Sequence, residues 1–382
     1  MPGWWTPACV LWYKGQPMQQ FLAAQPSSNG STAVAAAPPP SPSPLRSRPP
    51  RREQQSQSQS IKEATMADEH QELTKAFSGM GGLGVEETAL VSALGRWRKQ
   101  PEKRSQFRRG FPGFFTPPAA AVGAGAIERC SDDYVRHLKT EFARFKNLMV
   151  LWAMHPWERD ARWAHRALHK KHHPASVLVE LACTRTADEL LGARRAYHAL
   201  YHRSLEEDVA YRVKDAAANR LLLGLVSAYR YEGPRVDEML AREEAAALSA
   251  GPGAKAQSEL VVRVLATRSK PQLRATFRLY RELHSKPLEE EFGGEAPCLR
   301  EAVRCLESPA KYFGEVIDGA FKEGADKQAK AALTRVVVSR SDADMEEIKE
   351  AYLKQHGAKL LDAVAKNTHG HYRDALLAMI GK

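Results

Sequence analysis

The chain has 382 residues, 43% of them hydrophobic, and it carries 56 lysines and arginines against 45 aspartates and glutamates, a formal net charge of +11. This length allows more than one domain, and no apolar run approaches the roughly 20 residues that cross a bilayer. The positive charge favours anionic partners, nucleic acid and anionic lipid alike. Five cysteines without CxxC spacing indicate reduced thiols: Cys9, Cys130, Cys183, Cys298 and Cys305.

Residues 1–65 form a low-complexity extension. Its alanine, proline and serine runs at 33–44 and its Gln-Ser alternation at 55–60 bury too little side chain to offset the entropy of ordering. We therefore predict that the extension is disordered. No Asp or Glu precedes Glu53, so an organelle transit peptide is an alternative, and Met66 is an alternative start.

Residues 80–84 are a glycine-rich turn that runs into a helical pattern at 89–94. Glycines at this spacing let the chain fold back tightly and turn carbonyl oxygens outward. Glu86 and Glu87 then lie in the first helical turn, where the helix dipole favours negative charge. Such a nest of oxygens suits a hard cation such as Ca²⁺ if a carboxylate from elsewhere completes its shell. A plain connection between helices is the alternative.

The chain after residue 67 contains internal repeats, which we align on Thr184, Thr267 and Ser339, each followed by an arginine. In each repeat a tyrosine follows the anchor by thirteen residues and a leucine by twenty-one, and apolar residues stand six and three before it and six after it. These offsets approximate helical spacing and predict buried stripes on corresponding helices. The residues are Tyr197, Tyr280, Tyr352; Leu205, Leu288, Leu360; Leu178, Leu181, Val261, Val264, Leu333, Val336; and Leu190, Leu273, Met345.

A hydroxyl also stands two residues beyond each anchor, with a carboxylate or amide three residues further on. The pairs Thr186/Glu189, Ser269/Gln272 and Ser341/Asp344 predict reciprocal caps at helix starts. A fourth copy is expected before residue 156, with a loop insertion at 110–125. We predict an all-α fold of four repeats, at 66–155, 156–232, 233–315 and 316–382, in which the valine run 336–338 is buried helix rather than strand.

Several segments carry a family resemblance. Residues 155–161 read HPWERDA, residues 182–186 read ACTRT and residues 227–233 read SAYRYEG. Together they resemble annexins, and specifically a divergent subgroup of plant annexins, over about residues 69–382. The resemblance implies four repeats of five helices each in a curved disc whose convex face meets membranes through Ca²⁺.

The resemblance makes Ca²⁺ the expected cofactor and assigns its ligands in the first repeat. The carbonyl oxygens of Met80, Gly82 and Gly84 match the family's loop donors, and Glu141 matches the distal bidentate carboxylate. So few negative ligands imply a weak free site, roughly 10⁻⁴ to 10⁻³ M. A loop of the right sequence that binds poorly is the alternative.

The other three repeats depart from the calcium pattern, and we expect no Ca²⁺ there. Pro252 restricts the turn in the third repeat, and Asn367 replaces the distal acid in the fourth, where Glu323 and Asp326 leave a weak site as an alternative. In the second repeat a basic run replaces the glycines, and we predict that it attracts anionic lipid without calcium, more strongly at acid pH. This run is Lys170, Lys171, His172 and His173.

Two further pairs of residues allow either a functional or a structural interpretation. Cys183 and Cys305 match positions at which plant annexins carry cysteines associated with redox response, and burial in helices is the alternative. His165 and His169 lie four residues apart on one helical face, but the sequence supplies no carboxylate or cysteine to complete a transition-metal site. No catalytic grouping is recognisable, so we do not expect an enzyme.

The resemblance implies a calcium-dependent phospholipid-binding protein in stress-linked calcium signalling. It would be cytoplasmic and peripheral at the plasma membrane or endomembranes. Its expected partners are anionic phospholipid membranes, with actin or other proteins and self-association on membranes as further candidates, and without specific nucleic acid. The alternative is a calcium-independent helical scaffold that binds proteins or anionic surfaces through its basic face, and loss of the Glu141 carboxylate would distinguish the two.

Overall fold

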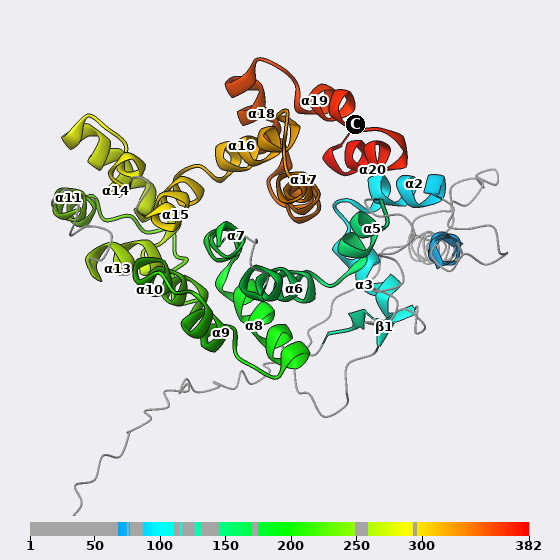
Figure 1. Cartoon of the computed structure of the whole chain (residues 1–382), viewed down its shortest axis with the longest axis horizontal. Helices are drawn as coiled ribbons and strands as arrows, with labels where there is room; N and C mark the ends of the chain where they lie inside the picture. The colour runs from blue at the N-terminus through cyan, green and yellow to red at the C-terminus, as the bar shows by residue number, and fades with distance from the viewer. Residues whose placement is uncertain are drawn as a thin grey trace, which may run out of the picture. The chain divides into compact units, whose positions relative to one another are not determined.

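The computed structural model describes residues 68–74, 76, 87–110, 115–116, 127–130, 145–169, 175–248, 259–292 and 296–381. The disorder predicted for residues 1–65 concerns residues outside these ranges. Within the described ranges the chain is helical except for one short pair of strands (Figure 1). The all-α prediction is therefore confirmed for this part of the chain.

The helices of the described ranges form four consecutive groups along the chain. The first group contains α2 (Glu87–Trp97), α3 (Pro101–Gly110) and α5 (Phe145–Ala153). The second contains α6 (Pro156–His169), α7 (Ser176–Thr184), α8 (Ala187–Tyr201), α9 (Leu205–Arg212) and α10 (Ala216–Val226). The third contains α11 (Glu238–Ala247), α13 (Glu259–Thr267), α14 (Lys270–His284), η1 (Leu288–Glu291) and α15 (Pro297–Glu307). The fourth contains α16 (Pro309–Phe321), α17 (Lys327–Arg340), α18 (Met345–His356), α19 (Leu360–Asn367) and α20 (Gly370–Ile380).

These bounds bear on the repeat boundaries predicted from the sequence. The boundary at 155/156 coincides with the start of α6, and that at 232/233 falls in the connection between α10 and α11. The boundary at 315/316 falls inside α16, so it would divide one helix. Pro309 at the start of α16 explains where this helix begins, because proline is preorganised for the first helical turn. The break between the third and fourth groups is at Ser308.

The predicted buried stripes are confirmed. All three aligned tyrosines and all three aligned leucines are buried, and so are the apolar residues six and three positions before each anchor. The valines of residues 336–338 lie in α17 and are fully buried, which confirms that they are helix rather than strand. The repeating register therefore specifies which side of each helix enters the core.

The three predicted caps behave differently. At α8 the Thr186 side chain accepts a hydrogen bond from the Glu189 N–H, and the Glu189 carboxylate accepts one from the Thr186 N–H, so the reciprocal cap is confirmed. At α14 Ser269 caps the helix, but the Gln272 side chain instead bonds to the backbone of Asp237. The cap predicted at α18 is wrong, as the next paragraph explains.

Helix α18 begins after a turn at residues 341–344 and has no side-chain cap. Asp344 is occupied by Arg340, whose Nε and Nη2 donate to the two carboxylate oxygens at 2.7 and 2.5 Å. Ser341 follows the last residue of α17 in helical conformation, so its hydroxyl is not at a helix start. The arginine thus competes successfully for the acid that the pattern assigned to the cap.

A short strand pair, not expected from the sequence, brackets part of the predicted loop insertion. β1 (Phe115–Thr116) pairs antiparallel with β2 (Arg129–Cys130), so that Phe115 lies opposite Cys130. Phe115 is buried and packs edge-on against Phe107 of α3, with 6.0 Å between ring centroids. Both ends of residues 117–126 are therefore attached to the core.

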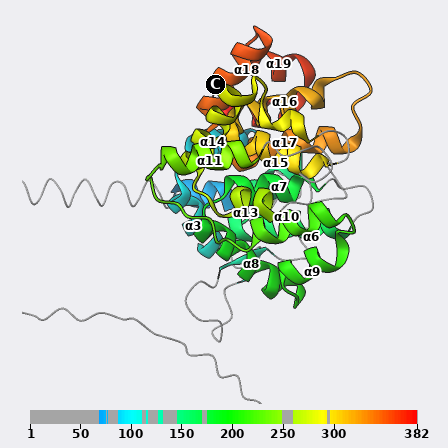
Figure 2. The same ribbon diagram turned by 90° about the vertical axis from the view of Figure 1, so that its left-hand side faces the viewer.

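Elements far apart in the sequence lie side by side. α2 packs against α20, and α17 packs against α5 and α20 (Figure 1). α7 packs against α15, and the two lie next to each other in Figure 2. Arg98, just beyond α2, donates to the carbonyl oxygen of Ile380 in α20. None of the helices in the described ranges is long and apolar enough to cross a membrane.

Candidate functional site

The predicted calcium ligands Met80, Gly82, Gly84 and Glu141 lie outside the described residues, and so do Lys170, Lys171, His172 and His173. Their assignment therefore stays a prediction. The structure does describe the elements on either side of these segments, and those elements determine where each segment starts and ends.

The segment with Met80, Gly82 and Gly84 follows the helical residues 68–74. Glu69 in this helix accepts hydrogen bonds from Lys103 Nζ at 2.8 Å and from Trp97 Nε1 at 3.2 Å. The Lys103 bond is the main reason that the pKa of Glu69 lies below its usual range. These contacts tie residues 68–74 to α2 and α3, and α2 begins at Glu87, directly after the segment.

The segment with Glu141 joins two anchored elements. Before it, the Cys130 N–H donates to the Glu158 carboxylate at 3.1 Å, and Arg162 Nε donates to the other oxygen of Glu158 at 2.8 Å. Glu158 is fully buried, and burial raises its pKa. After it, α5 begins with the buried Phe145. Both ends of residues 131–144 are thus fixed to the core.

In the fourth repeat two of the side chains at positions of the calcium pattern make contacts within the chain. Asp326 caps α17 by accepting from the Ala329 N–H at 2.7 Å. Asn367, at the position of the distal acid, donates from Nδ2 to the Ala363 carbonyl at 2.8 Å. Gly324 has a φ of +77°, which suits a tight turn and favours glycine. The expectation that this repeat binds Ca²⁺ weakly or not at all stays a prediction.

In the second repeat the basic run follows a stack of aromatic rings. His165 lies between Tyr201 and His169, with ring centroids 3.7 and 3.8 Å away. Burial and the neighbouring His169 lower the pKa of His165 to about 4, so this ring is neutral at physiological pH. A carboxylate that the sequence did not reveal, Asp208, lies 3.8 Å from His169 Nε2. Even so, no group of three or more His, Cys, Asp or Glu side chains in the described ranges is arranged to hold a metal ion.

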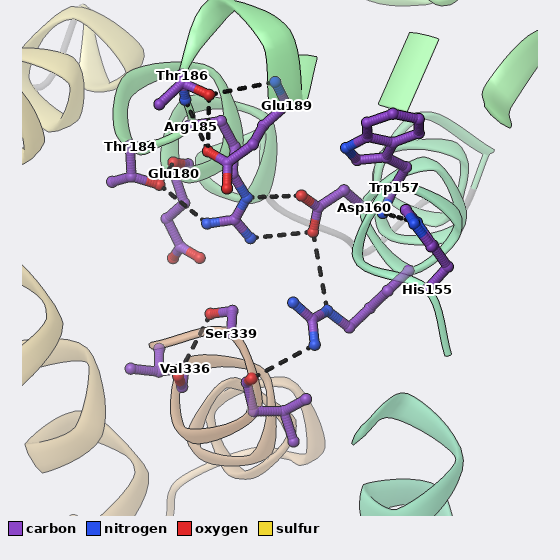
Figure 3. A network of polar contacts seen from close by, with 12 residues as sticks. His155, Trp157, Asp160, Glu180, Thr184, Arg185, Thr186, Glu189, Val336 and Ser339 are labelled. Atoms are coloured by element: carbon purple, nitrogen blue, oxygen red, sulfur yellow. Dashed lines mark hydrogen bonds and ion pairs between the residues drawn. The ribbon is translucent and has the colours of Figure 1, made fainter. Parts of the chain in front are cut away.

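A buried polar network between the second and fourth repeats was not found by sequence reasoning (Figure 3). Arg185 donates from Nε and Nη2 to both oxygens of Asp160, at 2.6 and 3.0 Å. Arg335 of α17 forms a similar two-bond contact with Glu180 of α7, at 2.7 and 2.8 Å. Of these residues the sequence pattern marks only Arg185, because an arginine follows each of the three anchors, and it does not mark its partner.

The structure brings Cys183 of α7 and Cys305 of α15 together. Both are buried, and their thiols are hydrogen-bonded. The contact with the other thiol lowers the pKa of Cys183 and raises that of Cys305. The cations of Arg230 and Lys270 lower the pKa of Cys183 further. Cys298 is a separate case, because burial raises its pKa to about 11.

Comparison with known proteins identifies the family. The family model described as Annexin matches residues 159–224 and 320–379. Annexin D4 of Arabidopsis thaliana is 43% identical over 322 residues, which cover 82% of this chain and 98% of that protein. The chain belongs to the annexin family. Annexin Gh1 of Gossypium hirsutum is 37% identical over 325 residues, covering 83% of this annexin and 96% of that protein. The solved structure of annexin III matches with a TM-score of 0.68 and 26% identity, covering 83% of this annexin and 94% of that chain.

These comparisons confirm the resemblance to plant annexins and the expected fold of annexin repeats. They also support the general property of the family, namely calcium-dependent phospholipid binding at the membrane periphery. They do not test the residues assigned to this property, which are the subject of the proposal below.

Proposed function

We propose that this annexin binds anionic phospholipid through a calcium ion held in its first repeat. The carbonyl oxygens of Met80, Gly82 and Gly84 and the carboxylate of Glu141 form the protein's part of the shell. The main support is family membership, combined with a glycine turn in the first repeat that is free of the proline found between Gly251 and Gly253 in the third. The anchored elements on both sides of the two segments add to it, because they limit how far apart these ligands can move.

The bilayer completes the site. Three carbonyls and one carboxylate leave open positions around an ion that prefers six to eight oxygens. A lipid phosphate or carboxylate fills those positions, so Ca²⁺ and lipid each strengthen the binding of the other by the same factor. A weak free site is then an advantage, because the protein stays off the membrane until calcium rises, as in stress-linked signalling.

The basic run of the second repeat supplies a calcium-independent attraction in this proposal. Lys170 and Lys171 are each worth about 1 kcal/mol near an anionic surface. His172 and His173 add to this when protonated at acid pH. The second repeat then contributes electrostatic attraction to the membrane, and the first repeat makes binding depend on calcium.

The deciding experiment is co-sedimentation with phosphatidylserine vesicles over a calcium titration. Glu141→Gln removes the charge that closes the shell, and we expect the calcium concentration for half-maximal binding to rise by at least about tenfold, as for loss of one charged ligand contact. Glu323→Gln in the fourth repeat is the matched control and should leave the titration unchanged. Vesicle binding that is equal for wild type and Glu141→Gln, or that needs no calcium, contradicts the proposal and favours the calcium-independent scaffold.

A second arm of this experiment tests the basic run. Replacing Lys170, Lys171, His172 and His173 by Ser should reduce sedimentation in the presence of a chelator, with the largest loss at pH 5.5. The calcium-dependent component should remain. If the substituted protein sediments with chelator as wild type does, the basic run has no part in lipid binding.

We also propose a redox role for Cys183 and Cys305, supported by their thiol contact. Oxidation would join the two sulfur atoms, release two protons and pass two electrons to a peroxide, which is reduced to water and an alcohol or to water alone. Mass spectrometry under non-reducing conditions should find this cross-link after peroxide treatment and should find none that involves Cys298. Recovery of both cysteines as free thiols after prolonged oxidation of the folded chain would leave simple burial in helices as their role.

A further inference from the structure

Arg159 of α6 is a buried cation with few partners. Only 4% of its side chain is exposed, and its Nε–H has no acceptor among the residues that the structure describes. Its Nη1 makes one long hydrogen bond, 3.4 Å, to the Val338 carbonyl of α17. The nearest carboxylate oxygen, Oδ1 of Asp160, is 4.0 Å from Nε. A guanidinium has five N–H donors, so most of this group's bonding capacity is unused.

The acids around Arg159 are committed to other arginines. Both oxygens of Asp160 accept from Arg185, and Asp342 is paired with Arg104. The groups that act on Arg159 are these two aspartates and two further arginines, Arg185 and Arg104. Neither aspartate pairs closely with Arg159, because each already binds one of those arginines.

Burial at this place disfavours the charged form of two groups, Arg159 and His155. Burial lowers the pKa of Arg159 itself to about 10. Burial and the charges of Arg108 and Arg159 lower the pKa of His155 to about 3, so the imidazole stays neutral. The ring of Trp163, 5.3 Å from the guanidinium carbon, compensates only in part, because it offers a quadrupole and no negative charge.

A second unsatisfied donor lies on the facing helix. The Ser341 hydroxyl is buried and makes no hydrogen bond within the described part of the chain. Ser341 stands three residues after Val338 in continued helical conformation, so it lies one turn further along the side of α17 that Arg159 contacts. Two buried donors, one of them charged, therefore belong to the same seam between α6 and α17.

We propose that this seam binds a small monovalent inorganic anion, of the class of chloride, with the Arg159 guanidinium as its main ligand and the Ser341 hydroxyl as a second donor. A buried charge without a counterion is costly, and an anion removes that cost where a water molecule satisfies only the donors. The burial of both residues excludes lipid headgroups and other large anions. The anion joins the second repeat to the fourth and stabilises the folded chain.

Thermal unfolding of the full chain in chelator tests this proposal. Sodium chloride is compared with sodium gluconate at equal ionic strength, so that only the anion differs. We expect a saturable rise in the midpoint temperature with chloride, on the order of 2–4 °C. Arg159→Met should abolish the rise and should unfold no earlier than wild type in gluconate, since an apolar side chain replaces an unpaired charge. Ser341→Ala should reduce the rise and keep the fold.

Arg230→Met is the control, because the Arg230 guanidinium is partly buried and donates to the carbonyls of Arg268 and Leu265. It should lower the midpoint in both salts and leave the chloride-dependent rise intact. Equal midpoints for the wild type in chloride and gluconate overturn the proposal, since water then satisfies the donors. A full chloride-dependent rise in both Arg159→Met and Ser341→Ala overturns it as well, because chloride then acts elsewhere.

Discussion

In the second repeat Arg185 reaches back 25 residues along the chain to Asp160, whereas in the fourth repeat the aligned Arg340 binds Asp344, four residues ahead. The third repeat follows the second, because Arg268 donates to Glu244, 24 residues back. The buried apolar stripes are the same in all three. One register therefore supports two kinds of polar contact, one that joins helices within a repeat and one that is confined to a helix end.

The same contrast separates the aligned tyrosines. The Tyr197 hydroxyl donates to Asp208 at 2.6 Å, within a fully buried cluster of α8 and α9. The Tyr352 hydroxyl is 3.4 Å from Asp318, which is partly exposed. Position in the repeat determines that a tyrosine is buried, and the surrounding helices determine how strongly its hydroxyl is held.

The largest difference in stability should be between variants of the two aspartates that pair with the aligned arginines, Asp160 and Asp344. Asp160→Asn leaves the buried Arg185 without its charged partner, and we expect the free energy of unfolding to fall by about 3–5 kcal/mol. Asp344→Asn should cost only about 1–2 kcal/mol, since water reaches this partly exposed end and replaces the carboxylate. Urea denaturation followed by circular dichroism measures both values. Equal losses would show that the two contacts are energetically equivalent despite their different geometry.

The buried stripes were predictable because burial of an apolar residue follows from its type and its spacing. Tyr280 and Leu288 needed no knowledge of the neighbouring helices. The pairing of Arg185 with Asp160 was not predictable in this way, because it depends on how α6 and α8 lie against each other. The cap predicted at Ser341 and Asp344 was wrong for a related reason. The sequence pattern is present, but the Asp344 carboxylate is paired with Arg340.

The candidate site shows where sequence reasoning stops. Glycine spacing at Gly82 and Gly84 indicates which backbone conformations are open, and the acidic residue Glu141 indicates which ligand is available. Neither determines the distance between them. Near Glu141 the structure describes the strand pair and the Cys130 contact with Glu158, both of which precede its segment. That contact joins residues 28 positions apart and left no local pattern to recognise.

Removing the tyrosine hydroxyls tests the contrast between the Tyr197 contact with Asp208 and the Tyr352 contact with Asp318. Tyr197→Phe takes a short hydrogen bond from a buried carboxylate whose other oxygen lies 3.1 Å from Arg203 Nε. We expect a loss of about 1.5–3 kcal/mol, typical of bonds to charged groups. Tyr352→Phe should cost about 0.5 kcal/mol, because its bond is long and water can replace it. The two variants are compared by the same denaturation measurement, and a larger loss for Tyr352→Phe would reverse the assignment of the strong and weak contacts.

The smallest effect concerns the two hydroxyls aligned as caps. Thr186→Ala removes a working reciprocal cap and should cost about 1 kcal/mol, while Thr186→Ser should restore most of it. Ser341→Ala removes a hydroxyl that caps no helix, so in chloride-free buffer it should change the free energy of unfolding by less than about 0.5 kcal/mol. In chloride the same variant should become less stable than wild type, since the proposed anion loses a donor. A cap contributes equally in both salts, so a salt-independent loss for Ser341→Ala would mean that its hydroxyl has a partner within the protein after all.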